Sequence, residues 1–197
     1  MIAPVTAASL AEVFAPEQIV RVRATGHRAT GQEAGLTHGP TRGFLADVGL
    51  PVAGGVLFEL RKDLADGPTP LRTASLVQDL TDYEGFSPGV HRWLHLGRAL
   101  HAEVALDGGT GRVHVVNHEV RRIEWVHTDV SSMVHGMSLL QLRRPDYDPP
   151  GVFPEIDDLI RIAEEIRDAL TAVDPVPFGT GDGLWEAVFD DIAGGMW

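Results

Sequence analysis

Residues 85–89 read GFSPG and fit the pattern G-x-S-x-G, which marks the nucleophile elbow of α/β-hydrolases. Such an elbow needs a helix after the serine and an oxyanion hole built partly by the N–H of the next residue. The residue after Ser87 is Pro88, which has no N–H, and losing one oxyanion donor costs about 3 kcal/mol of transition-state stabilisation. We therefore interpret the segment as a Ser-Pro-Gly turn that leads into a strand, and we predict no catalytic serine.

Nine histidines raise the question of a metal site. Two pairs have the i, i+4 spacing that suits a metal on a helix: His91 with His95, and His114 with His118. Both pairs lie in strand-like segments, where residues four apart are separated by about 13 Å, too far to share one zinc ion. Histidines from different strands could still converge, so a histidine-based metal protein or hydrolase remains the least favoured alternative. We predict no metal, no cofactor and no enzyme activity.

The sequence DGGTG at 107–111 has the glycines of a phosphate-binding loop but lacks the Lys-Ser/Thr pair of a P-loop. A strand pattern follows it, where a phosphate loop would be followed by a helix N-terminus. The glycines are typical of a tight hairpin that needs positive φ. We therefore predict a turn here and no nucleotide site.

Acidic residues concentrate near the C-terminus of a chain whose formal net charge is −12. Residues 145–197 contain 13 acidic side chains and only two arginines, whereas residues 1–144 are close to neutral. Such a field repels nucleic acids and anionic membranes and favours a partner with a basic surface. The plain alternative is a solvated surface that keeps the protein soluble. We expect neither nucleic acid nor membrane as a partner.

The elements that position these residues follow from periodicity and from turn residues. Residues 24–43 are rich in Gly, Thr and His and predict a loop, and residues 143–151, RRPDYDPPG, predict a linker. Expected helices are 6–14 with Thr6 as its cap, 39–51 with Pro40 in its first turn, a helix capped by Asp129, a long helix from Pro154, and 184–195. Expected strands are 52–60, 91–98, 101–107, 111–117 and 122–128. Helices combined with a mostly antiparallel, twisted sheet predict an α+β fold, with helices flanking the sheet.

The long helix from Pro154 divides into an apolar and an acidic side. Its apolar stripe is predicted to be Ile156, Leu159, Ile160, Ala163, Ile166 and Leu170. Neighbouring acids on a helix point in different directions, so its acid pairs favour a solvated face over acid–base chemistry. The residues predicted to bind a partner are Asp157, Asp158, Glu164, Glu165, Asp168, Asp190 and Asp191.

Composition predicts one domain over 1–197, divided into an N-terminal helix and loop (1–35), a core (36–142) and an acidic helical extension (143–197). Hydrophobic residues make up 44% of the chain, enough for a sizeable core. Cysteine is absent, which excludes disulfides and thiolate metal sites. The chain has no apolar run of membrane-spanning length and no signal-peptide pattern at its start. We therefore expect a cytoplasmic protein.

Four short motifs occur in an order that resembles a known family. They are Phe44-Leu45 with Gly49-Leu50-Pro51; Leu96-Gly97; Leu106-Asp107 with Thr110-Gly111-Arg112-Val113; and Thr128, Asp129, Ser131 and Met133 at a helix start. Together they resemble the fourth subfamily of the SUKH superfamily, the Smi/Knr-like immunity proteins. The resemblance covers residues 36–142, with a looser match at Trp185.

The resemblance implies an α+β sheet flanked by helices, no enzyme activity, and inhibition of a cognate protein toxin. Partners in the superfamily are often nucleases or nucleic-acid deaminases of polymorphic toxin systems. A regulatory or scaffold protein of the same fold, with a non-toxin partner, is the main alternative.

Overall fold

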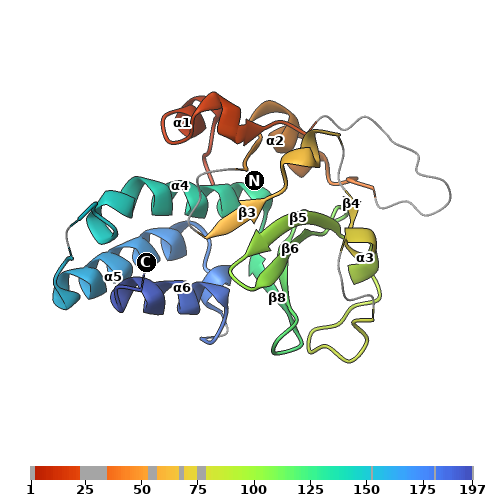
Figure 1. Cartoon of the computed structure of the whole chain (residues 1–197). Coiled ribbons are helices and arrows are strands. Elements are labelled where there is room, and N and C mark those ends of the chain that lie inside the picture. The colour runs from red at the N-terminus through yellow and green to blue at the C-terminus, as the bar shows by residue number, and fades with distance from the viewer. Residues whose placement is uncertain are drawn as a thin grey trace.

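The computed structural model describes residues 3–22, 35–52, 57–66, 69–74, 79–151, 153–179 and 181–196. Helices are combined with an antiparallel sheet, which confirms the predicted α+β class (Figure 1). The α-helices are α1 (Ala7–Ala11), α2 (Gly39–Asp47), α3 (Leu71–Ala74), α4 (Val130–Tyr147), α5 (Ile156–Val173) and α6 (Leu184–Ala193). The strands are β1 (Ile19–Val20), β2 (Leu50–Pro51), β3 (Phe58–Leu60), β4 (Thr69–Pro70), β5 (Leu94–Ala99), β6 (Ala102–Leu106), β7 (Val113–Asn117) and β8 (Arg122–His127).

The main sheet has the strand order β3-β5-β6-β7-β8, with β4 also paired to β5, and every pair is antiparallel. The predicted hairpin is confirmed, since β6 and β7 pair from Ala102↔Asn117 to Leu106↔Val113. Its turn is held by the carboxylate of Asp107, which accepts from the N–H of Gly109 at 2.9 Å. Gly111 has φ +82°, a conformation that favours glycine. β8 is the last strand in this order, and Glu84 forms a parallel bridge with Arg122 on the outer side of its first half.

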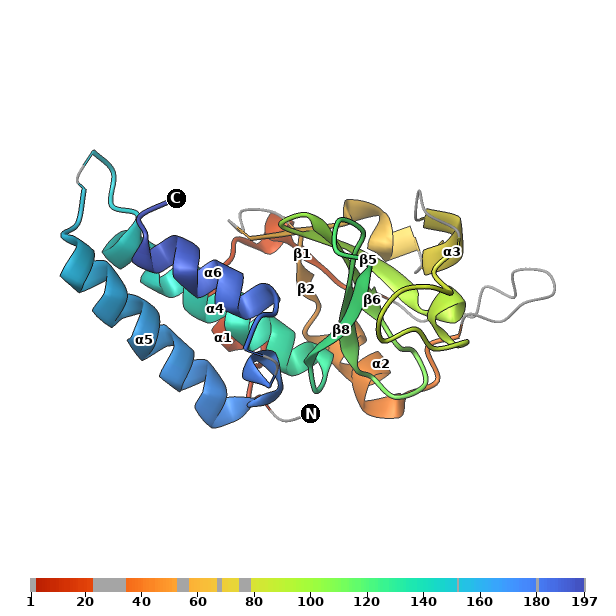
Figure 2. The same ribbon diagram turned by 90° about the horizontal axis from the view of Figure 1, so that it is seen from below.

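The two faces of the sheet bury two separate clusters, because side chains alternate along each strand. Val113 and Val115 of β7 belong to the larger core, which includes the helices α4, α5 and α6. Val116 belongs to a smaller cluster, where Trp93 and Tyr83 from the segment before β5 cover the sheet. The sheet therefore stands between the group of three long helices and the segment that contains α3 (Figure 2).

Helix α4 begins where the sequence predicts and ends later than predicted. The carboxylate of Asp129 accepts from the N–H groups of Ser131 (2.9 Å) and Ser132 (3.1 Å), which confirms it as the N-cap. The linker predicted at 143–151 is wrong for residues 143–147, because the helix continues through Pro145 to Tyr147, and it is confirmed for residues 148–151, which follow α4. Tyr147 is buried and its hydroxyl donates to the carbonyl of Leu140 at 3.0 Å, so packing holds a turn that a proline would otherwise end.

Helix α5 confirms the predicted long helix but buries a slightly different face. Its buried residues are Leu159, Ile162, Ala163, Ile166 and Leu170. The prediction that Ile156 and Ile160 belong to the buried stripe is wrong, since both are exposed. Apolar side chains cover two adjacent faces of α5. The face that contains Ile162 is the buried one, because α4 and α6 pack against it.

Several smaller predictions have mixed outcomes. Thr6 caps α1, and α6 lies where the sequence predicts it. Helix α2 begins at Gly39 as predicted but ends at Asp47, because Leu50–Pro51 form β2, and residues 39–43 of the predicted loop belong to this helix. Residues 24–34 of the predicted loop and residues 53–56 of the predicted strand lie outside the described residues. The strand predicted at 91–98 starts only at Leu94, because Val90–Arg92 form a short 3-10 helix.

Candidate functional site

Ser87 lies in an exposed turn, as the sequence predicts. Its Oγ accepts from the N–H of Gly89 at 3.4 Å, with Pro88 between them. A short 3-10 helix follows where a nucleophile elbow requires an α-helix. The serine therefore lacks both the helix and the backbone donor that an elbow supplies.

The histidines singled out for a metal site have separate surroundings. His91 lies in the 3-10 helix and His95 in β5, while His114 of β7 stacks on Trp93 with ring centroids 4.0 Å apart. Burial lowers the pKa of His114 to about 4, so this imidazole is neutral at pH 7. Within the part of the chain that the structure describes, no group of three or more His, Asp or Glu side chains could hold a metal ion.

His118 forms part of a polar row on the covered face of the sheet. Its Nδ1 lies 3.0 Å from the hydroxyl of Tyr83, and its Nε2 lies 3.2 Å from a carboxylate oxygen of Glu103. Tyr83 also packs in the smaller cluster, so the row attaches the segment before β5 to strands β6 and β7. A carboxylate–imidazole–phenol row can move protons, but here the phenol is buried in the smaller cluster and the carboxylate lies within β6.

A second polar group is centred on His127 between the sheet and the helices; His127, Asp174 and Trp185 are buried and Thr128 is half-buried. His127 accepts at Nε2 from the indole N–H of Trp185 (3.0 Å), and its Nδ1 lies 3.5 Å from Asp174. Asp174 also accepts from the N–H and the hydroxyl of Thr128, each at 2.9 Å. Burial alone would raise the pKa of the Asp174 carboxyl, but these donors hold it well below its usual range.

This buried group joins β8 to the C-terminal helices. Trp185 lies at the start of α6, and Asp174 directly follows α5, so both helices are held against the end of β8 through His127. It has the carboxylate and imidazole of a catalytic triad, but the third member is an indole donor, which is no nucleophile. No sequence pattern links the three, because 58 residues separate His127 from Trp185 and nothing local marks their contact.

The predicted acidic residues of α5 form an exposed stripe along the helix. Asp157, Glu164 and Asp168 recur at intervals of seven and four residues, which places them on one outward face. Within the described residues, none of the three has a basic side chain within 4.0 Å. Three uncompensated carboxylates on one face leave a strongly negative surface.

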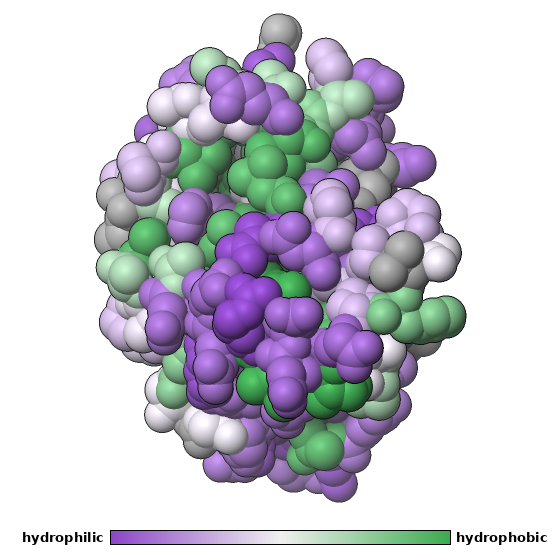
Figure 3. Space-filling view, turned by 90° about the vertical axis from the view of Figure 1, so that its left-hand side faces the viewer, coloured by the Kyte–Doolittle hydropathy of each residue, from purple (hydrophilic) through white to green (hydrophobic). Residues whose placement is uncertain are grey.

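The other two predicted residues of α5 are paired with arginines. Arg161 contacts Asp158 at 3.0 Å and Glu165 at 2.7 Å, and Arg143 of α4 contacts Glu165 at 2.9 Å. These residues lie toward the end of the molecule where α4 and α5 connect, and Figure 3 shows polar side chains gathered on that end. Exposed pairs of this kind contribute about 0.2–1 kcal/mol each, so their main effect is to reduce the negative charge there.

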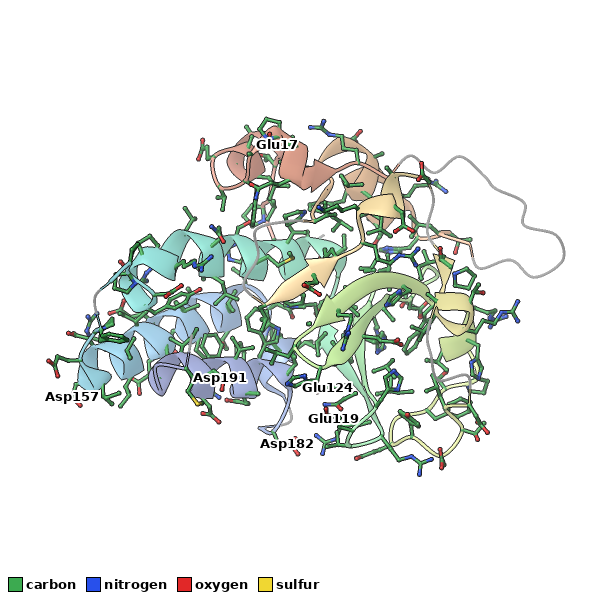
Figure 4. The ribbon with its side chains drawn as sticks, in the orientation of Figure 1. Glu17, Glu119, Glu124, Asp157, Asp182 and Asp191 are labelled. Carbon is green, nitrogen blue, oxygen red and sulfur yellow. The ribbon has the colours of Figure 1, made fainter. Side chains whose placement is uncertain are left out.

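The two predicted residues of α6 lie apart from this stripe. Asp190 is exposed and Asp191 is half-buried. Figure 4 shows Asp157 at the far end of α5 from the sheet and Asp191 on α6. The carboxylate of α6 that faces α5 is Glu186, and it is already paired with Arg167. The seven predicted residues therefore form two acidic surfaces on separate helices.

A groove that the sequence did not predict runs along β8. It consists of two adjacent cavities of about 320 Å³ and about 630 Å³, which share Arg122, Glu124 and Asp182. The smaller cavity extends past the exposed Val120 to the turn between β5 and β6, and the larger one reaches Trp125. Figure 4 shows Glu124 on β8 beside Asp182, which precedes α6.

Three carboxylates and one guanidinium line the centre of this groove. Arg122 contacts Asp182 at 2.9 Å and Glu84 at 3.4 Å, so it neutralises part of their charge. Glu124 accepts from the N–H of Leu184 at the first turn of α6, where a negative charge is favourable. Burial raises the pKa of Glu124, since neither the N–H nor Arg122 fully compensates its desolvated carboxylate.

Trp125 provides an exposed aromatic surface in a fixed orientation. Its indole N–H donates to the carbonyl of His127 at 2.7 Å, and the guanidinium of Arg112 lies 4.2 Å from the ring centroid. The side chain is 38% exposed although both contacts hold it. Aromatic residues held in this way lose little side-chain entropy on binding and are common at the centres of protein interfaces.

Comparison with known proteins gives one result. The model of the SUKH-4 immunity protein family matches residues 5–191, which include α4, α5, most of α6, the acidic residues of α5 and α6, and the groove along β8. No curated protein and no solved structure matches the chain. In the described residues, no helix is both long and apolar enough to cross a membrane. Because the match spans nearly the whole chain, this protein belongs to the SUKH-4 immunity protein family.

Proposed function

We propose that this protein is a cytoplasmic immunity protein that binds a cognate toxin domain and blocks it without catalysis. The observation that carries the proposal is the family match over residues 5–191, because immunity proteins act by binding toxins. The toxin class we propose is a nuclease or nucleic-acid deaminase of a polymorphic toxin system. Such enzymes present basic surfaces to their nucleic-acid substrates, and the acidic C-terminal region complements a basic surface.

In this proposal the acidic residues of α5 and α6 attract the toxin from a distance. Asp157, Glu164 and Asp168 form an uncompensated stripe, and Asp190 extends the negative field to α6. Exposed charges of this kind accelerate encounter and suppress unsuitable partners more than they add affinity. The electrostatic field of these solvated carboxylates extends into the solvent, and it reaches less far as the salt concentration rises.

The experiment is co-expression with the toxin domain encoded by the adjacent gene. We expect the protein to restore growth of cells that produce the toxin and to co-purify with it as a stoichiometric complex. A cell that dies despite soluble protein, together with no complex in the purified mixture, would contradict the proposal. Stable binding to a non-toxin product of a neighbouring gene would instead favour a regulatory or scaffold role.

A further inference from the structure

The groove along β8 has a shape that the acidic stripe of α5 lacks. Its two cavities are continuous through three shared residues, and one wall comes from the sheet: β8 in both cavities, with β7 and the turn between β5 and β6 added in the smaller one. The opposite wall comes from the segment 182–184 and the start of α6. A concave surface between two elements can surround a side chain of a partner, whereas an exposed helix face touches it from one direction only.

The composition of the groove follows the pattern of a protein interface. Apolar or aromatic surface is exposed at each end, from Val120 (63%) and from Trp125. Between them lie the carboxylates of Glu84, Glu124 and Asp182 with Arg122. Of these carboxylates only Glu124 is partly desolvated, and aromatic anchors next to such groups often carry much of the affinity in known interfaces.

The charges of the groove select a basic occupant. Three carboxylates face one guanidinium, and Glu124 is both desolvated and without a basic side chain within 4.0 Å among the described residues. An arginine or lysine entering the larger cavity would compensate Glu124. Trp125 follows Glu124 on β8 and faces the other side of the sheet, so a neighbouring side chain of the same loop would pack on its indole. An acidic or phosphorylated occupant would meet uncompensated carboxylates.

We propose that the groove along β8 is the docking site for a basic loop of the toxin, which inserts an arginine or lysine between Glu84, Glu124 and Asp182 and packs on Trp125. This inference rests on the proposed function and adds to it the contact surface. The stripe of α5 then governs how fast the toxin arrives, and the groove governs how long it stays.

The test compares two pairs of charge reversals that change the net charge equally. The groove pair is Glu84→Lys with Asp182→Lys, whose side chains are 77% and 61% exposed and can be replaced without disturbing the core. The control pair is Asp157→Lys with Glu164→Lys on α5. The probe is the toxin domain encoded by the adjacent gene, carrying an inactivating substitution, and association and dissociation rates are measured at low and high salt.

We expect the groove pair to raise the dissociation rate about 30-fold or more, as for charged groups at the centre of an interface. We expect the control pair to slow association about threefold to tenfold and to change dissociation less than about twofold. Equal dissociation rates for the groove pair and the unmodified protein would overturn the groove as the docking site. A larger rise in dissociation for the control pair would move the docking site to α5.

Two further variants show whether a change in the dissociation rate comes from lost contacts or from misfolding. Val120→Lys changes an exposed residue at the other end of the groove and should raise the dissociation rate about fivefold to tenfold. Trp125→Ala should raise it more, and its circular dichroism spectrum must match that of the unmodified protein. If the unmodified protein itself shows no binding, the proposed function fails. If it binds and all groove variants bind equally well, only the groove assignment fails.

Discussion

The acidic stripe of α5 and the groove along β8 are both negative, yet they differ in what surrounds their charges. On α5, Asp157, Glu164 and Asp168 are solvated on a convex helix face. In the groove, Glu124 is partly buried, receives an N–H from α6, and lies in the same cavity as Trp125. The number of charges on a surface is therefore a different property from how tightly that surface can hold a partner. Solvated charge acts at long range and weakly, whereas desolvated charge in a fixed setting acts at contact and selectively.

The two regions also depend on the fold in different ways. The stripe requires only that α5 be helical, because its residues are spaced along one element. The groove requires that α6 be held against β8, because its walls belong to elements about 60 residues apart in the sequence. The buried contact of His127 with Trp185 and Asp174 provides that attachment. Loss of this contact should therefore affect the groove more than the stripe.

Trp185→Ala should disrupt the groove before it affects the stripe. Trp185 is fully buried, packs on Phe58 and Phe189, and donates to His127. We expect the free energy of unfolding to fall by about 3–5 kcal/mol in urea denaturation, through the cavity and the lost hydrogen bond. Trp185→Phe, which keeps most of the packing, should cost about 1–2 kcal/mol less than the alanine variant. Equal stability for Trp185→Ala and the unmodified protein would contradict the role of this contact.

Reversal of the charged surface of α5 should isolate the long-range effect. In a variant with Asp157, Asp158, Glu164 and Glu165 replaced by lysine, we expect association with the toxin domain to slow about tenfold to 100-fold. The salt dependence of the rate should weaken, because the steering field is removed. The rates are measured by stopped-flow mixing at several salt concentrations. An unchanged association rate would exclude the stripe from toxin recognition.

Acidification should lower the free energy of unfolding through His114 of β7. The folded-state pKa of His114 is about 4, below the value of about 6.5 in an unfolded chain, so the unfolded state takes up the proton first as pH falls. This contribution to stability is complete above pH ~6.5 and is lost progressively toward pH ~4, by about 3 kcal/mol. Urea denaturation at pH 7.5 and pH 4.5 measures the loss.

The matched variant for this measurement is His114→Gln, which keeps a polar side chain on β7 but does not titrate. The pH dependence of its unfolding free energy should be shallower by the contribution of this one imidazole. An identical pH dependence in both proteins would show that other groups account for the acid sensitivity.

Arg161→Ala should produce the smallest effect and reports on the net charge of the stripe. Its contacts with Asp158 and Glu165 are exposed, so we expect a loss of less than about 0.5 kcal/mol in unfolding free energy. If the toxin presents the proposed basic surface, removal of one positive charge should increase the association rate about twofold. A slower association in this variant would mean that the arginine itself contacts the toxin.

Local sequence signals predicted much of the fold. Gly108 to Gly111 predicted the turn between β6 and β7, and Asp129 predicted the start of α4, because turns and caps depend on a few consecutive residues. The linker around Pro145 was predicted wrongly for the same reason. The local signal for a helix end is strong there, but burial of Tyr147 outweighs it, and burial depends on residues far away in the sequence.

The two candidate sites also differ in how far local sequence could locate them. The stripe of α5 could be located from helical spacing alone, although the arginines that pair Asp158 and Glu165 belong partly to α4. The groove could not be located, because neither Trp125 nor Asp182 stands in a recognisable motif. These two residues line one cavity only because the fold brings them together. The spacing of residues along one sequence carries no information on such contacts.

Residue identity and spacing along the chain were enough to establish the α+β class, the family resemblance, the hairpin, the cap of α4 and the acidic character of the C-terminal region. All of these follow from nearby residues, which govern backbone conformation and local charge. Three features emerged only from the folded molecule: which face of α5 is buried, which acids are paired, and that β8 and α6 enclose a groove. Those features depend on the energy of packing distant segments together, which no single segment encodes.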